Sequence, residues 1–291
     1  IQGRANQDEL AQRPYYVIAR VPISLLKALE YRHGLTEKQG LEMLTELGYR
    51  GIGLASLQAA GGTQESAAAG FFYALRLLLS SAGYPAPATW SEGNSMAIST
   101  VLPIDPITSL LAGLAGQELR RRADLLVVQI ARPVNGSTRV CFVPVEVKHH
   151  GQVSHPERIQ ANDQELQRAR EQLSSTVEVI EKIAEAIHTG TGGAQDPFGS
   201  YARYVGLATL LDLAMSLAPV QPDVSTRADV LRAVLNGQVE IGVGDPVLLW
   251  FAPGSLGING AACLVDPFRS GLQPPGHSTR ELFIDLSLIH I

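Results

Sequence analysis

Two charged side chains share one face of a segment that otherwise has the composition of a buried strand. Residues 139–148 read RVCFVPVEVK, and their β-branched and aromatic side chains predict a strand. Side chains of a strand alternate between its two faces, so Glu146 and Lys148 lie on one face while Val145 and Val147 lie on the other. The pair is either the solvated end of an ordinary strand or part of a polar site at its edge.

A third charged residue, Asp124, opens the preceding predicted strand, ADLLVVQIAR, and PVNGST joins the two strands with the Asn-Gly dipeptide typical of hairpins. Two carboxylates on adjacent strands can hold a hard cation such as Mg²⁺, with Mn²⁺ as a substitute. Such a cation polarises a phosphate and lowers the pKa of a bound water. A lysine on the same face can orient that water and offset negative charge. These residue types therefore predict a metal site with Asp124 and Glu146 as ligands and Lys148 as a catalytic group.

The register of the hairpin decides whether the two carboxylates can meet. With a two-residue Asn-Gly turn, Asp124 would pair with Val147, and the carboxylates would lie on opposite faces. A shared site requires a shift of one residue, from an odd-length loop within 133–138 or from a β-bulge. Pro144 cannot donate a ladder hydrogen bond, and proline often marks a bulge. We therefore expect an irregularity in that loop or at Pro144.

A predicted helix over 107–122, a strand opened by Asp124, a hairpin, a strand with Glu146-Val147-Lys148 and a long helix follow one another over residues 107–190. This order resembles the core of the PD-(D/E)XK nuclease superfamily, although Ala123 replaces the proline of the name-giving pattern. The resemblance implies an α/β fold with a restriction-endonuclease-like core, a mixed sheet whose catalytic hairpin is flanked by helices. It also implies a Mg²⁺-dependent deoxyribonuclease that uses one or two metal ions.

Other side chains near these elements have two interpretations each. Glu118 is either an additional acidic ligand or a solvated helix charge. Gln172 is similar to a glutamine of the RecB-like branch of the superfamily, or it is a surface residue. Arg120, Arg121 and Arg122 either contact DNA phosphates or form the cationic end of the preceding helix.

A looser likeness extends over RRRADLLVVQIARP, FVPVEVKHH and AREQLSSTVEVI. These segments look like the nuclease segment found beside HerA/FtsK-type ATPases in bacterial defence systems, including DptH-like restriction proteins. The resemblance implies a prokaryotic restriction or antiviral defence protein with an ATPase domain downstream in the same chain. The alternative is a non-catalytic nuclease-like domain that docks DNA or partner subunits for such an ATPase.

Composition narrows the classes of partner and compartment. The 291 residues are 45% hydrophobic and 18% charged, which is typical of a globular chain rather than a disordered one. A net charge of −5 argues against coating nucleic acid through bulk charge, but it allows a local basic site. The two cysteines match no CxxC or zinc pattern, and reduced thiols predict a cytoplasmic protein. No apolar run is long enough for a membrane span, so no membrane partner is expected.

The chain divides into segments of different composition. We expect residues 1–83 to form a mainly helical N-terminal domain and 84–106, rich in proline, to be a linker. Residues 107–218 are expected to form the nuclease-like domain, and 219–285 a C-terminal α/β segment that leads to a missing domain. The final residues, 286–291, resemble the translation of a sequencing adapter and are expected not to be native.

Overall fold

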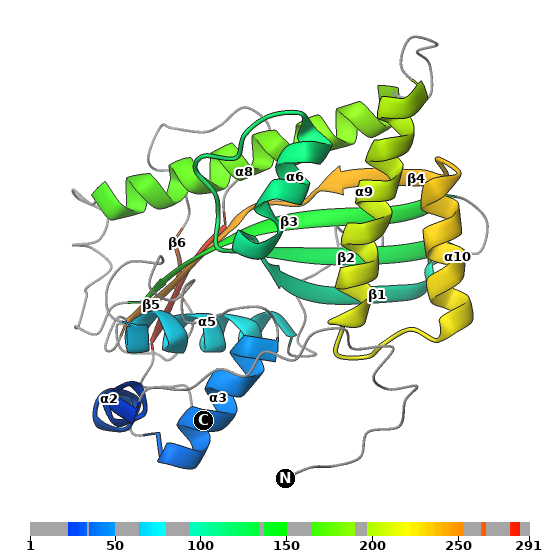
Figure 1. Ribbon diagram of the computed structural model, residues 1–291. Coiled ribbons are helices and arrows are strands. Elements are labelled where there is room, and N and C mark those ends of the chain that lie inside the picture. The colour runs from blue at the N-terminus through cyan, green and yellow to red at the C-terminus, as the bar shows by residue number, and fades with distance from the viewer. Residues whose placement is uncertain are drawn as a thin grey trace.

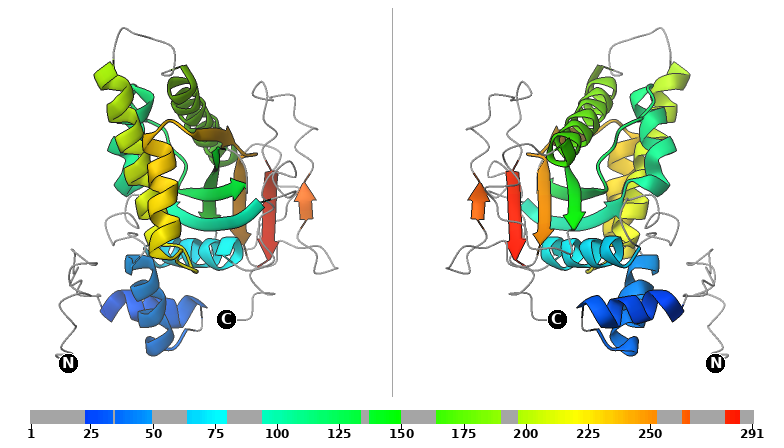
Figure 2. Two further views of the ribbon diagram at one scale, coloured as in Figure 1. Left: turned by 90° about the vertical axis from the view of Figure 1, so that its right-hand side faces the viewer. Right: turned by 90° about the vertical axis from the view of Figure 1, so that its left-hand side faces the viewer.

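The computed structural model describes residues 23–33, 35–49, 64–79, 94–133, 137–149, 164–189, 197–252, 263–265 and 280–285 of the chain. These residues form an α/β structure, a mixed sheet with helices on both of its faces (Figure 1, Figure 2). The segment expected to derive from an adapter, 286–291, lies outside the described residues. None of the helices that the structure describes is both long and apolar enough to span a bilayer.

The described strands form one sheet in the order β1-β2-β3-β5-β7-β6, with β4 also paired to β3. β1 (Asn94–Pro103), β2 (Leu125–Pro133) and β3 (Thr138–His149) are antiparallel neighbours. β1 lies in the 84–106 segment where the sequence predicts a linker, and the structure places a strand there instead. Its small and β-branched residues pair along the whole of β2, so residues 94–103 belong to the sheet.

β3 changes its parallel neighbour part-way along its length. Its first half pairs with β4 (Val239–Val243) and its second half with β5 (Val247–Ala252). The register shifts by one residue between the two halves, so residues 244–246 form a bulge opposite Pro144. Proline has no N–H to donate, and it therefore fits the place where the ladder is interrupted.

The parallel half of the sheet continues beyond β5. β7 (Arg280–Asp285) pairs in parallel with β5, and β6 (Cys263–Val265) pairs antiparallel with β7. The predicted C-terminal segment 219–285 thus supplies strands to the same sheet as the predicted catalytic hairpin.

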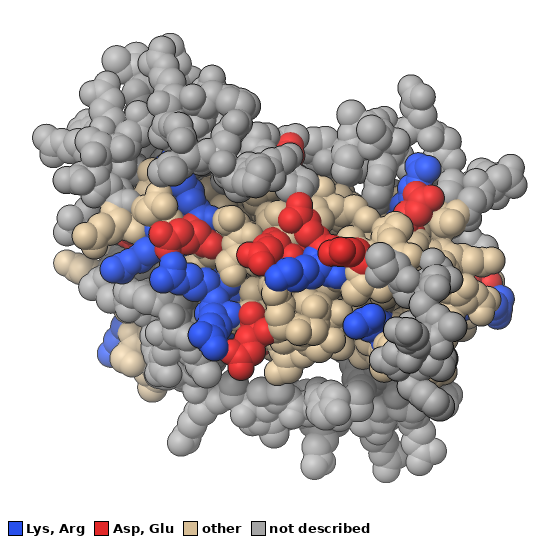
Figure 3. Space-filling view, turned by 90° about the horizontal axis from the view of Figure 1, so that it is seen from above, with Lys and Arg blue, Asp and Glu red and all other residues tan. Residues whose placement is uncertain are grey.

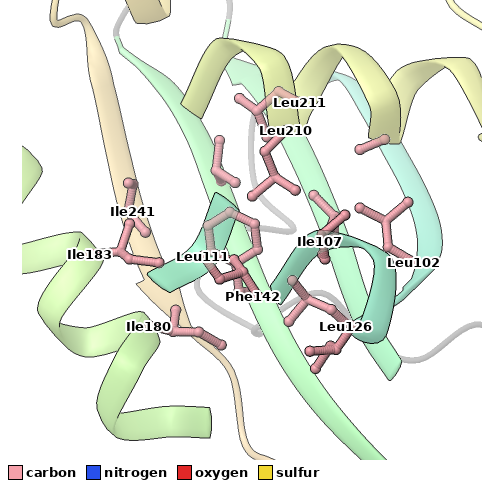
Figure 4. Close-up of a cluster of buried hydrophobic side chains, with 14 of the residues drawn as sticks. Leu102, Ile107, Leu111, Leu126, Phe142, Ile180, Ile183, Leu210, Leu211 and Ile241 are labelled. Carbon is pink, nitrogen blue, oxygen red and sulfur yellow. The ribbon is translucent and has the colours of Figure 1, made fainter. Parts of the chain in front are cut away.

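One face of the sheet, here called the α8 face, is covered by α6 (Thr108–Ala115), α8 (Gln164–Thr189), α9 (Pro197–Ser216) and α10 (Val224–Leu235) (Figure 1). Figure 4 shows Phe142 of β3 surrounded by leucines and isoleucines from these helices and from neighbouring strands. The amphipathic pattern of α8 predicts an inward stripe, and the structure buries all its members except the partly buried Ala184: Leu166, Ala169, Leu173, Val177, Ile180 and Ile187.

The opposite face, here called the α5 face, is covered by α5 (Gln64–Leu79). On its outer side, α5 contacts α2 (Ile23–His33) and α3 (Glu37–Tyr49), so it is enclosed on two sides and is apolar nearly all round (Figure 1). Gly70 allows the close approach, because a Cβ at this position would lie 2.9 Å from the Cβ of His149.

α6 ends earlier than the helix predicted over 107–122. Gly116 has a φ of 68°, in the left-handed region that favours glycine, and its N–H bonds the carbonyl of Ala112. Residues 117–124 then run to β2 without helix or strand. Glu118 and the three following arginines therefore lie on an irregular segment, and the interpretation of the arginines as a cationic helix end is wrong.

Candidate metal and catalytic site

The hairpin has the register that a shared site requires. Leu125 pairs with Val145, and the ladder is regular from there to Ala131, so Asp124 lies one step before this pair, on the side of Glu146. A two-residue turn would have placed Asp124 opposite Val147. The shift therefore arises toward the loop, and Pro144 causes none in this ladder because its bulge lies on the β4–β5 side.

Asp124, Glu146 and Lys148 interact directly at the end of this hairpin. Lys148 Nζ donates to Glu146 Oε1 at 2.6 Å, and the Val147 N–H donates to Asp124 Oδ2 at 2.9 Å. The Glu146 side chain is 0% exposed and that of Lys148 is 14% exposed. Alternation along β3 puts Glu146 and Lys148 on the same side as Phe142, which is the α8 face.

Burial and mutual charge shift the pKa of all three side chains. Burial raises the pKa of Glu146 well above its ordinary value, and the charge of Asp124 adds to this effect. Burial also raises the pKa of Asp124, although Lys148 opposes the shift. Burial alone would lower the pKa of Lys148, but the charges of Glu146 and Asp124 outweigh it and raise that pKa. The cluster thus has two carboxylates competing for one ammonium group.

The donor set fits a hard cation. Glu146 Oε2 is buried and accepts no hydrogen bond from a fixed donor, but the Glu146 carboxyl lies within hydrogen-bonding reach of the Asp124 carboxyl and main chain. A buried carboxyl pair of this kind is stabilised either by a shared proton or by a bound cation. Within the described residues, no group of three or more His, Cys, Asp or Glu is placed to hold a metal. One or two carboxylates suit Mg²⁺, which keeps several waters of its own.

Asp124 is held in place although it precedes the strand. Its carbonyl accepts a hydrogen bond from the Ile104 N–H at 3.0 Å. From α8, Gln172 Nε2 donates to the Arg122 carbonyl at 3.0 Å, and Thr176 Oγ1 accepts from the Ala123 N–H at 2.8 Å. Gln172 is therefore half-buried against the segment that carries Asp124, and the structure does not place it on the open surface.

The remaining predicted charged residues bind partners other than the two carboxylates. Glu118 and Arg120 are exposed and bind each other at 3.0 Å, so Glu118 is not part of the cluster. Arg121 binds Glu171, and Arg122 binds Asp105 at 2.6 Å. On the surface seen from above in Figure 3, the described positive and negative side chains are interleaved and form no continuous basic patch. Phosphate contacts by these arginines would require exchange of these partners.

The sequence prediction missed three residues near the cluster. The charge of Asp105 acts on Asp124, and that of Glu165 acts on Lys148. Thr176 is fully buried in α8. Only Thr176 left a signal in the sequence, as a hydroxyl within an otherwise apolar helical stripe. The other two become neighbours through long-range folding.

Comparison of this chain with known protein families, with curated proteins and with solved structures yields no match. The functional argument therefore depends on the geometry of the cluster itself and on its residue types.

Proposed function

We propose that this chain is a metal-dependent deoxyribonuclease module that hydrolyses phosphodiester bonds with Mg²⁺, or with Mn²⁺ as a substitute. The observation that carries the proposal is the Glu146 carboxylate. It is fully buried, one of its oxygens binds Lys148, and the same carboxyl lies directly against that of Asp124. Two adjacent carboxylates at the end of a packed core are stabilised by a bound cation, whereas packing alone favours apolar residues there.

Each residue has a distinct role in this proposal. Asp124 and Glu146 hold the cation, which when bound polarises the phosphate and supplies a water of lowered pKa. The Lys148 ammonium group lies beside Glu146 and can donate a hydrogen bond to the attacking water or to the charge that develops on the phosphate. The Val147 N–H fixes the orientation of the Asp124 carboxylate.

DNA as the substrate rests on the resemblance of Asp124, Glu146 and Lys148 to the PD-(D/E)XK pattern, and so does the restriction-endonuclease-like core. A role in restriction or antiviral defence and an ATPase domain in the same chain are extensions of the looser resemblance, whereas a cytoplasmic location rests on the two cysteines. The mixed sheet with its antiparallel hairpin and flanking helices is compatible with all of them.

The test is nicking of supercoiled plasmid DNA by the purified chain with Mg²⁺, with Mn²⁺ and with chelator. We expect metal-dependent nicking that Glu146→Ala abolishes and that Lys148→Ala slows by about 10²–10³-fold, as for loss of one preorganised electrostatic group. Circular dichroism should show that both variants keep the fold.

Matched controls come from α3, where Lys38 and Glu42 form an exposed pair. Lys38→Ala and Glu42→Ala should nick DNA at the wild-type rate. Wild-type activity in Lys148→Ala would remove the lysine from the mechanism. A wild-type chain that binds DNA but never nicks it with either metal would contradict the nuclease proposal and favour a non-catalytic docking domain.

A further inference from the structure

α8 packs on the face of the sheet that carries Glu146 and Lys148, and it also contacts the segment before Asp124. Residues 117–124 form neither a helix nor a strand. The position and orientation of Asp124 therefore depend on hydrogen bonds from other elements. Two of these bonds come from main-chain donors, the N–H groups of Ile104 and Val147. Two more come from side chains of α8, Gln172 and Thr176. Elsewhere in the segment, the side chains of Gln117, Arg121 and Arg122 bind Lys182, Glu171 and Asp105.

Thr176 is placed where helix packing alone would favour an apolar residue. It is fully buried, one turn from Leu173 and one turn from Ile180, which are both fully buried as well. Its O–H donates to the Gln172 carbonyl at 2.8 Å, within the helix. Its oxygen still has acceptor capacity, which the Ala123 N–H uses at 2.8 Å. Valine would fill the same volume, so the acceptor for Ala123 is what distinguishes threonine here.

The position of the acceptor matters because Ala123 directly precedes Asp124. A metal site tolerates displacements of only about 0.5 Å in its ligands. Replacing a side chain that hydrogen-bonds to a metal ligand and orients it typically changes metal affinity or activity by about 10–100-fold. We infer that Thr176 is a positioning residue that, with Gln172, holds the main chain before Asp124 so that its carboxylate meets that of Glu146. The inference rests on the proposed function, because it assigns Asp124 as a metal ligand.

The test compares Mn²⁺ affinity, measured by isothermal titration calorimetry on the full chain, in Thr176→Val and wild type. Thr176→Val keeps the shape and removes the acceptor, so we expect the dissociation constant for Mn²⁺ to rise by about 10–100-fold. Thr176→Ser keeps the hydroxyl and should regain most of the affinity. Cleavage by Thr176→Val should recover at saturating Mn²⁺, since the defect lies in metal binding, whereas a general loss of packing would not be corrected by metal.

Thr209 provides a matched control on α9. Its hydroxyl makes the same bond within the helix, to the Val205 carbonyl at 2.9 Å, and it is exposed. Thr209→Val should bind Mn²⁺ like wild type. Amide hydrogen exchange gives a readout without metal, because the Ala123 N–H should exchange faster in Thr176→Val than in wild type.

Wild-type Mn²⁺ affinity in a folded Thr176→Val variant would overturn the inference while leaving the proposed function intact. If Thr176→Val does not fold, the inference is tested with Gln172→Met, which removes only the donor to the Arg122 carbonyl. A folded Gln172→Met variant with weakened Mn²⁺ binding supports the inference, and one with wild-type binding overturns it. A wild-type chain that binds no Mn²⁺ contradicts the proposed function itself.

Discussion

The two faces of β3 differ in what their side chains do. On the α5 face, Cys141, Val143 and Val145 are buried among the apolar residues of α5 and its neighbouring helices. On the α8 face, the strand begins in the same way with Val140 and Phe142. Beyond Pro144, this face changes to a glutamate and a lysine, although Glu146 is as fully buried as Val145.

If the charged residues form the proposed site, one strand serves stability on its α5 face and chemistry on its α8 face. Because successive residues face opposite sides, the α5 face can remain continuous core while the α8 face changes to charged residues at the same depth. Substitutions on the α5 face should therefore lower stability, whereas substitutions of the charged residues should change the chemistry and leave or improve the stability of the metal-free protein.

The largest effect on stability is expected where α5 packs most closely on β3. In Gly70→Ala, the added Cβ would meet the Cβ of His149, which is too near the main chain to move aside easily. We expect the free energy of unfolding to fall by about 2 kcal/mol, as for overpacking of a core, measured by urea denaturation.

Gly113→Ala in α6 is the matched control, because nothing lies within 4 Å of the added Cβ. It should raise the free energy of unfolding by about 0.5–1 kcal/mol through helix propensity. Equal stability of Gly70→Ala and wild type would show that α5 does not need its close contact with the sheet.

A smaller effect of opposite sign is expected at Glu146. With both carboxylates ionised, Asp124, Glu146 and Lys148 together have a net charge of −1, and Glu146→Gln makes the group neutral. We expect the metal-free variant to be more stable than wild type by about 1 kcal/mol, within the range of substitutions that relieve a functional site. Thermal unfolding in the presence of chelator measures this difference.

Addition of Mg²⁺ should then reverse the order, because ligand binding to the folded state stabilises only the chain that binds it. A Glu146→Gln variant that is less stable than wild type without metal would mean that the carboxylate is needed for packing. The contrast between the two faces of β3 would then fail.

The smallest effect concerns pH. Burial and the charge of Asp124 raise the folded-state pKa of Glu146 above its ordinary value of 4.5. Stability linked to its neutral carboxyl is fully present below the unfolded-state pKa and is lost as the pH rises through the folded-state pKa. The advantage of Glu146→Gln over wild type in the free energy of unfolding should therefore grow from acidic to neutral pH. Urea denaturation of both chains across this range, with chelator, measures it.

If the difference in free energy of unfolding between Glu146→Gln and wild type stays constant across this pH range, the pKa of Glu146 is the same in the folded and unfolded states.

The sequence was sufficient to predict the hairpin and the three charged residues because the relevant rules are local. Alternation places Glu146 with Lys148, and the need for a one-residue register shift follows from counting residues across the turn. The observed Leu125–Val145 pair confirms that shift. The predicted role of Pro144 was only half right, since its bulge lies toward β4 and β5.

Features that depend on distant segments were missed. β1 lies in a proline-rich segment that the sequence predicts to be a linker. Its pairing with β2 depends on the assembled sheet and not on a local pattern. The helix predicted to reach Arg122 ends at Ala115, because one glycine in the left-handed region stops it. The bonds from Gln172 and Thr176 to the segment before Asp124 join residues about 50 positions apart, which no local pattern reports.

The central claim is that Asp124 and Glu146 bind one metal ion between them. The most direct measurement is an anomalous difference map from crystals of the chain soaked in Mn²⁺. We predict a peak between the two carboxylates, with metal–oxygen distances of about 2.0–2.2 Å to each and its other ligands from waters or main-chain carbonyls. The peak should be absent in Glu146→Gln crystals. A peak elsewhere, or none at a Mn²⁺ concentration that supports DNA cleavage, would contradict the account.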